Sequence, residues 1–136
     1  VYKNDLKDGP AKEFFPDGRI SLEKQYKEGK QTGLSKEYYD DGRLWLARSF
    51  DDSKNGTLKE YYRSGELRQE WNVKNGILEG PSKSYYRTGE LMSEEAYSDG
   101  KKNGLFKYYG RNKALSYEEL YKDDVRTDRK VFGPSF

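Results

Sequence analysis

One twelve-residue phrase is written three times in succession, with a lysine, two tyrosines and two glycines at fixed places. It reads GLSKEYYDDGRL at 33–44, GTLKEYYRSGEL at 56–67 and GPSKSYYRTGEL at 80–91. Weaker copies flank these three, and the five leading glycines are spaced 24, 23, 24 and 24 residues apart: Gly9, Gly33, Gly56, Gly80 and Gly104. Self-similarity at a fixed period is typical of repeat architectures. The chain must therefore fold as stacked copies of one unit.

Further columns become visible when positions are counted from each leading glycine as offset zero. Offset three is lysine in all five units: Lys12, Lys36, Lys59, Lys83 and Lys107. Offset five is aromatic in all five: Phe14, Tyr38, Tyr61, Tyr85 and Tyr109. Offset six is aromatic in four: Phe15, Tyr39, Tyr62 and Tyr86. Offset eleven is Ile20, Leu44, Leu67, Leu91 or Leu115, and offset seventeen is Tyr26, Phe50, Val73, Tyr97 or Tyr121.

Each unit has the pattern of a β-hairpin, because aromatic and aliphatic residues alternate with charged ones between glycine-bearing turns. The first turns read PDG, DDG, RSG and RTG. They fit a three-residue loop in which glycine takes the positive φ that follows a type I turn. This geometry pairs offset five with offset eleven and offset six with offset ten. A second turn, such as EGKQTG or DGKKNG, connects one hairpin to the next.

A lone hairpin is marginal in water, so the units must stabilise one another as neighbours. The sequence predicts an all-β fold, an elongated, twisted, single antiparallel sheet of tandem hairpins with two strands per repeat. We expect one array with a half-repeat at 1–8, five repeats and a partial repeat or cap at 127–136; the repeats are 9–32, 33–55, 56–79, 80–103 and 104–126. Since the chain starts within a repeat, we expect a fragment or a mature form, and both a cytoplasmic and an exported location stay open.

The turn geometry also assigns residues to the two faces of the sheet. Three groups share a face that we expect to be the core: Tyr38 with Leu44, Leu46 and Phe50, Tyr61 with Leu67, Trp71 and Val73, and Tyr85 with Leu91 and Tyr97. The offset-six aromatics lie on the opposite face, near Trp45 and Met92. A register shift by one residue would exchange the two faces.

Composition narrows the possible functions. The chain has no histidine and no cysteine, which removes the commonest general base, thiol nucleophiles and most transition-metal ligands. DDSKNG at 51–56 resembles the start of a twelve-residue calcium-binding loop. The twelfth position of that loop would be Tyr62, where a carboxylate is required. The 26 basic and 24 acidic residues are interspersed, without the basic block typical of nucleic-acid binding. We therefore expect no enzyme, no cofactor, no metal and no nucleic-acid partner.

The repeated phrase, together with YKEGKQTG and YSDGKKNG, resembles the MORN-variant repeat family, whose bacterial members include YwqK-like antitoxins and surface or lipoproteins. The resemblance extends over 2–132 and implies an extended antiparallel sheet with a binding role. More loosely, the tandem aromatic hairpins are similar to cell-wall choline-binding modules.

Two functional hypotheses follow. The first is a non-catalytic module that binds another protein, in the manner of an antitoxin or immunity protein. The alternative is a bacterial surface or envelope module that binds glycan or lipid through its aromatic rows. The offset-six column is interpreted either as structural packing between hairpins or as an exposed binding ladder. The candidate binding residues are Phe15, Tyr39, Trp45, Tyr62, Tyr86, Met92, Arg43, Arg63 and Arg87.

Overall fold

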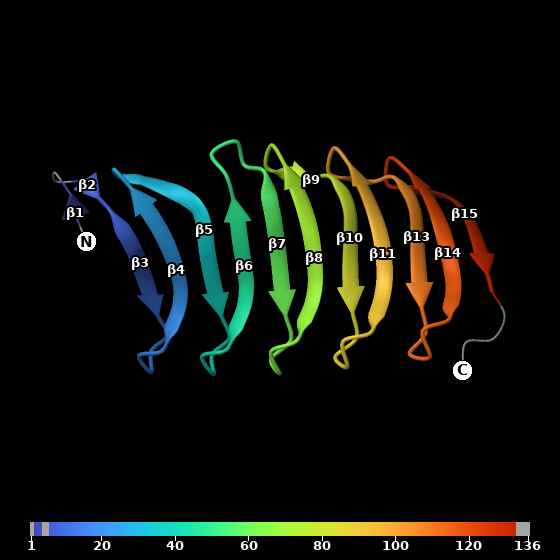
Figure 1. Ribbon diagram of the computed structural model, residues 1–136, viewed down its shortest axis with the longest axis horizontal. Helices are drawn as coiled ribbons and strands as arrows, with labels where there is room; N and C mark the ends of the chain where they lie inside the picture. The colour runs from blue at the N-terminus through green and yellow to red at the C-terminus, as the bar shows by residue number, and fades with distance from the viewer. Residues whose placement is uncertain (1, 4–5, 133–136) are drawn as a thin grey trace.

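The computed structural model describes residues 2–3 and 6–132 of the chain (Figure 1). The described part is all β, without a helix, and so contains none that is long and apolar enough to cross a membrane. The strands are β1 (Tyr2–Lys3), β2 (Leu6–Lys7), β3 (Gly9–Phe14), β4 (Ile20–Lys27), β5 (Lys30–Tyr38), β6 (Leu44–Phe50), β7 (Gly56–Tyr61), β8 (Leu67–Lys74), β9 (Ile77–Leu78), β10 (Gly80–Tyr85), β11 (Leu91–Ser98), β12 (Lys101–Lys102), β13 (Gly104–Tyr109), β14 (Leu115–Lys122) and β15 (Val125–Val131).

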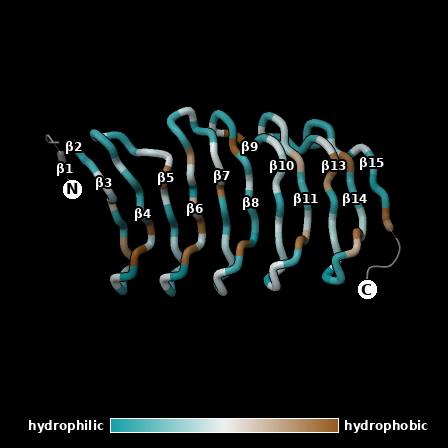
Figure 2. The backbone as a smooth tube through the Cα atoms, in the orientation of Figure 1, coloured by the Kyte–Doolittle hydropathy of each residue, from teal (hydrophilic) through white to brown (hydrophobic). Residues whose placement is uncertain are grey.

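The hairpins stand side by side in chain order and form one open antiparallel sheet of 13 strands, from β3 to β15 (Figure 1). The strands β1 and β2 form a separate two-stranded ribbon at the N-terminal end. The fold class predicted from the repeat is therefore confirmed. Figure 2 shows hydrophobic segments near the first-turn ends of the strands, where the offset-eleven residues lie, and another at the opposite end of the sheet around β9.

The first turns have the predicted register. Tyr38 pairs with Leu44, and the Tyr39 N–H donates to the Arg43 carbonyl at 2.8 Å. The Gly42 N–H donates to the Tyr39 carbonyl at 3.0 Å, and Gly42 has a φ of 89°. A side chain at such a φ would be strained, which explains the glycine at offset nine.

A β-bulge follows each first turn, on the second strand of the hairpin. In the second repeat the pairing passes from Tyr38↔Leu44 directly to Glu37↔Leu46, so Trp45 is an extra residue in β6. Because Tyr38 and Glu37 are neighbours in β5, they point to opposite faces, and their partners in β6 do the same. The same register shift occurs in the other four hairpins, between Glu13 and Phe14, Glu60 and Tyr61, Ser84 and Tyr85, and Tyr108 and Tyr109.

Because of the bulge, some residues lie on the opposite face of the sheet from the one predicted. Arg48 Nη1 lies 3.5 Å from Glu37 Oε2, which places Arg48, and with it Leu46 and Phe50, on the face opposite Tyr38. The groupings that cross a bulge are wrong: Tyr38 with Leu46 and Phe50, Tyr61 with Trp71 and Val73, and Tyr85 with Tyr97. The groupings of Tyr38 with Leu44, Tyr61 with Leu67 and Tyr85 with Leu91 are confirmed.

We call the face that carries the offset-three lysines and the offset-five aromatics the lysine face, and the opposite face the packed face. The buried side chains of the described residues lie on the packed face: Val73, Ser82, Ser84, Ser93, Phe106 and Glu119. Phe106 is only 1% exposed and packs against Tyr97 and Tyr121, with ring centroids 5.8 and 4.9 Å away. The prediction that the Tyr38 face is the better core is therefore wrong.

The second turns stack on one another by backbone hydrogen bonds, which we call the second-turn ladder. Four of these turns have two consecutive residues with positive φ: Glu28–Gly29, Asn75–Gly76, Asp99–Gly100 and Asp123–Asp124. Each donates an N–H to the second turn before it: Gly29 to Lys7 at 2.8 Å, Gly76 to Lys54 at 3.0 Å, Gly100 to Leu78 at 2.9 Å and Asp124 to Lys102 at 2.9 Å.

The second repeat, which is one residue shorter, breaks this ladder. Its turn closes by hydrogen bonds between Asp51 and Asn55 and between Lys54 and Asp51, with positive φ at Lys54. Within the described residues, this turn makes no backbone hydrogen bond to the turn at Glu28–Gly29. The strands β6 and β7 then pair in continuous register from Phe50↔Gly56 onwards.

Candidate functional site

The offset-six tyrosines tie each hairpin to the next one at the first-turn edge of the sheet. Tyr39 Oη donates to the Tyr61 carbonyl at 2.5 Å, and Tyr62 Oη donates to the Tyr85 carbonyl at 2.7 Å. Tyr86 Oη donates in the same way to the Tyr109 carbonyl at 2.6 Å. The three rings are half-buried. Each of these hydroxyl groups thus joins its own hairpin to the following one.

An arginine from the following hairpin covers each of these rings. Arg63 Cζ lies 4.7 Å from the Tyr39 ring centroid, Arg87 Cζ 5.9 Å from Tyr62 and Arg111 Cζ 5.4 Å from Tyr86. A guanidinium over a tyrosine ring at this distance is attracted by the ring electrons. We call these three tyrosines and three arginines the first-turn ladder.

Polar contacts hold Arg63 of the ladder in place and link it to Arg43 of the preceding first turn. Arg63 Nη1 donates to Asp40 Oδ1 at 2.7 Å, and Arg43 Nη1 donates to the Arg63 carbonyl at 2.8 Å. The hydrogen bond from Arg63 holds the pKa of Asp40 below its usual value. Both side chains of this pair are largely exposed, so the ion pair adds little stability and serves mainly to orient the guanidinium.

The remaining predicted site residues lie at the same edge. Trp45, the bulge residue of β6, lies with its ring centroid 6.0 Å from that of Tyr39, and its Nε1 donates to Glu60 Oε2 at 3.1 Å. Met92 occupies the equivalent position in β11 and is half-buried. Phe15 opens the first turn of the first hairpin, but it has no hydroxyl with which to reach the next one.

The structure thus brings the predicted residues together along one edge and gives the offset-six column a structural role. The three predicted arginines are exposed and therefore accessible to a partner: Arg43, Arg63 and Arg87. Arg111 was missed because its unit lacks the glycine at offset nine and has Gly110 in place of the second aromatic, although Arg111 stands at offset seven as Arg63 and Arg87 do. Glu60 was also missed, since only the bulge brings it within reach of Trp45.

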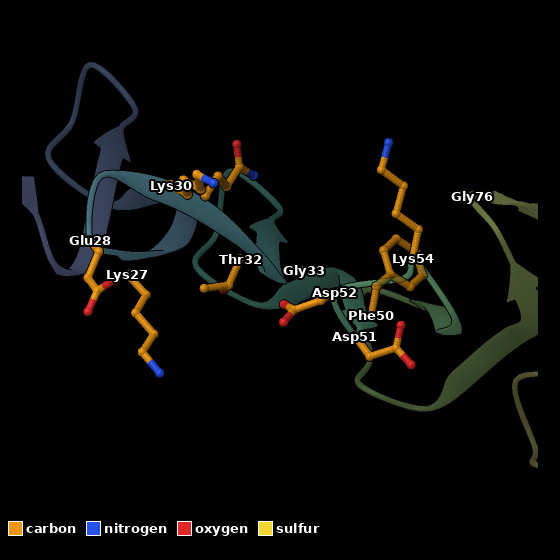
Figure 3. Close-up of a pocket in the computed structure, with 11 residues that line it drawn as sticks. Lys27, Glu28, Lys30, Thr32, Gly33, Phe50, Asp51, Asp52, Lys54 and Gly76 are labelled. Atoms are coloured by element: carbon orange, nitrogen blue, oxygen red, sulfur yellow. The ribbon is translucent and has the colours of Figure 1, made fainter.

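A groove of about 770 Å³ marks the break in the second-turn ladder (Figure 3). It lies between the segment 27–33 and the turn 50–54, and charged side chains of both signs line it. Asp51, from the calcium-like phrase DDSKNG, uses Oδ1 to accept the N–H groups of Ser53 and Asn55 at 2.9 and 3.0 Å. That carboxylate caps its own turn. The described residues contain no group of three or more acidic, histidine or cysteine side chains arranged to hold a metal ion.

Comparison with known proteins supports the repeat. Three segments match the family model of the MORN repeat variant: residues 7–28, 54–75 and 78–99. Each match begins shortly before a leading glycine and ends in the following second turn, so the matches follow the hairpins in one phase. Repeats of this kind are commonly binding modules. No curated protein is significantly similar to the chain.

Proposed function

We propose that the array is a non-catalytic binding module, that its partner is another protein, and that the first-turn ladder forms the contact surface. The observation that carries this proposal is the row of exposed arginines, each held over a tyrosine of the preceding hairpin. Arginine, tyrosine and tryptophan are the residues that dominate binding energy at protein interfaces.

Preorganisation makes such a row effective. A flexible arginine loses side-chain entropy when a partner immobilises it, at a cost of about 0.5–1.5 kcal/mol. Arg63 is already fixed by the Tyr39 ring and by the Asp40 carboxylate, although its side chain is 57% exposed. Part of that cost has therefore been met in the free protein, and more of the contact energy is available for binding.

Within this class we propose an antitoxin or immunity role, in which the array covers a surface of a toxic protein. The repeat match and the row of exposed arginines over tyrosine rings support this proposal. It is tested by expressing the chain together with the product of the neighbouring gene in its native genome. Rescue of growth supports the role, and unchanged toxicity contradicts it.

The contact surface is tested with the purified partner. We expect Arg63→Ala together with Arg87→Ala to weaken binding by about 2 kcal/mol or more, which isothermal titration calorimetry would measure. Arg129→Ala is the matched control, because Arg129 Cζ also covers a tyrosine, Tyr117 at 4.8 Å, but Arg129 belongs to the strand β15 and not to a first turn. The control should bind as the unmodified chain does.

Two outcomes would overturn the proposal. Equal affinity of the double variant and the control would remove the first-turn ladder as the contact surface. Retention of the chain on purified cell envelope, with no protein partner, would favour the alternative function of binding glycan or lipid.

A further inference from the structure

The lysine face carries a row of alternating charge that crosses the sheet from one hairpin to the next. The lysine at offset three pairs with the residue at offset fourteen of its own hairpin and with the one at offset fourteen of the hairpin before it. In four repeats that residue is a glutamate: Glu23, Glu70, Glu94 and Glu118. Opposite charges at directly paired positions of a sheet stabilise each other.

The second repeat interrupts the row with Ala47. Its pairing partners are Lys36 in β5 and Lys59 in β7, so a lysine stands on either side of a methyl group. Elsewhere in the row a glutamate separates the lysines, as where Lys59 Nζ lies 3.5 Å from Glu70 Oε2. Within the described residues, Lys36 forms no ion pair shorter than 4.0 Å. One negative charge is therefore missing from the row at Ala47.

The missing side chain also leaves space. A hollow of about 310 Å³ lies over β4, β5 and β6, and its lining includes Glu23, Leu34, Lys36, Ala47, Arg48 and Ser49, so two cations and one carboxylate border it. We call it the Ala47 hollow. Leu34 pairs with Ser49 and is 48% exposed, which gives the hollow an apolar wall beside its positive charge.

We propose that the Ala47 hollow binds an acidic side chain, glutamate or aspartate, of the partner protein. This inference rests on the proposed protein-binding function and adds a second contact on the lysine face. Adjacent strands lie about 4.8 Å apart, so a carboxylate above Ala47 would be within reach of Lys36, which lines the hollow, and of Lys59, which lies one strand beyond it and also contacts Glu70. It would take the place that the glutamate has in the other repeats, while Leu34 contacts an apolar neighbour of the acidic residue.

The test uses the isotope-labelled full chain and nuclear magnetic resonance. The probe is the capped tripeptide acetyl-Ala-Glu-Ala-amide, and the control is acetyl-Ala-Gln-Ala-amide. We expect the glutamate peptide to shift the amide signals of Lys36, Ala47 and Lys59 in a saturable manner, and the glutamine peptide to leave them unchanged. Added salt should weaken the effect, because these charges are exposed to solvent.

The decisive variant is Ala47→Glu, which supplies the missing carboxylate. It should fold, because four repeats carry glutamate at this position, and circular dichroism checks that it does. We expect it to weaken binding of the glutamate peptide by about tenfold or more, because the new carboxylate fills the place above position 47, offsets the charge of the two lysines and repels the carboxylate of the peptide. Lys36→Gln should weaken it as well.

Three outcomes would overturn this inference. The first is an equal response to the glutamine peptide. The second is a stronger response to inorganic phosphate than to the glutamate peptide, which would assign the hollow to phosphate. The third is binding to phosphatidylserine vesicles that Ala47→Glu abolishes, which would assign it to a lipid surface. If the protein partner binds Ala47→Glu normally but loses affinity for the Arg63 and Arg87 variant, the proposed function stands and this inference fails.

Discussion

Replacing Tyr62 by phenylalanine tests whether the offset-six column holds the array together. The change removes only the hydroxyl that donates to the Tyr85 carbonyl at 2.7 Å, and it leaves the ring beneath Arg87. A lost hydrogen bond with a partly buried acceptor costs about 1 kcal/mol. At a denaturant dependence of about 2 kcal/mol per molar urea, the unfolding midpoint should fall by about 0.5 M.

The matched control lies one residue earlier. Tyr61 points to the lysine face, and its hydroxyl forms no hydrogen bond to another described residue, so Tyr61→Phe should leave the midpoint almost unchanged. Urea unfolding followed by circular dichroism measures both variants. If Tyr62→Phe is no less stable than Tyr61→Phe, the hydroxyls do not bind the hairpins together and the column is free for another role.

Three further predictions address the charge row, the tyrosine network and the repeat. Ala47→Glu should raise the free energy of unfolding by about 0.5–1 kcal/mol through its two lysine neighbours, and lower stability in urea would show that the position requires a small side chain. Burial raises the pKa of Tyr97 and of Tyr108, and the hydrogen bond to Glu94 raises the pKa of Tyr109 to about 12. Because these folded pKa values lie above the unfolded value of 10.0, the neutral tyrosines stabilise the folded state fully below pH 10, and this contribution is lost as the pH rises. The melting temperature should therefore fall between about pH 10 and 12, and a melting temperature that does not change over this range would contradict the prediction. Deletion of 56–79 should leave a folded but less stable array by circular dichroism, since each repeat contacts only its neighbours, and a disordered product would refute the nearest-neighbour model.

The repeat predicted the fold because glycine at offset nine has a strict physical cause. Only a residue that tolerates a positive φ closes a three-residue turn in this way, and Gly18, Gly42, Gly65 and Gly89 all have φ values from 89° to 103°. The period then fixed the order of the strands. The fifth unit kept its hairpin without this glycine, because Lys113 takes the same conformation with a φ of 70°.

The faces could not be predicted, because a β-bulge has no constant residue. The bulge position is Ser21, Trp45, Arg68, Met92 and Ser116 in the five repeats. A single extra residue exchanges the faces of everything that follows it, so strict alternation from the turn placed Phe50 and Val73 on the wrong side. The lysine column was visible in the sequence, but its pairing with offset fourteen depends on the same bulge.

Several departures from the repeat pattern lie together in the second repeat. In an array, stacking constrains each position through the repeats on both sides, so a deviation loses contacts unless something else replaces them. The repeat 33–55 is one residue shorter at its second turn, and it has Ala47 where the other repeats have glutamate. It also lacks the turn-to-turn hydrogen bond that Gly29 and Gly76 make elsewhere. Two spaces beside charged groups accompany these three losses: the groove at 50–54 and the Ala47 hollow. A merely degenerate repeat is expected at the end of an array, where only one neighbour constrains it. This one lies inside the array, with a well-formed hairpin on either side, which agrees with the contact with a partner that we propose for the Ala47 hollow.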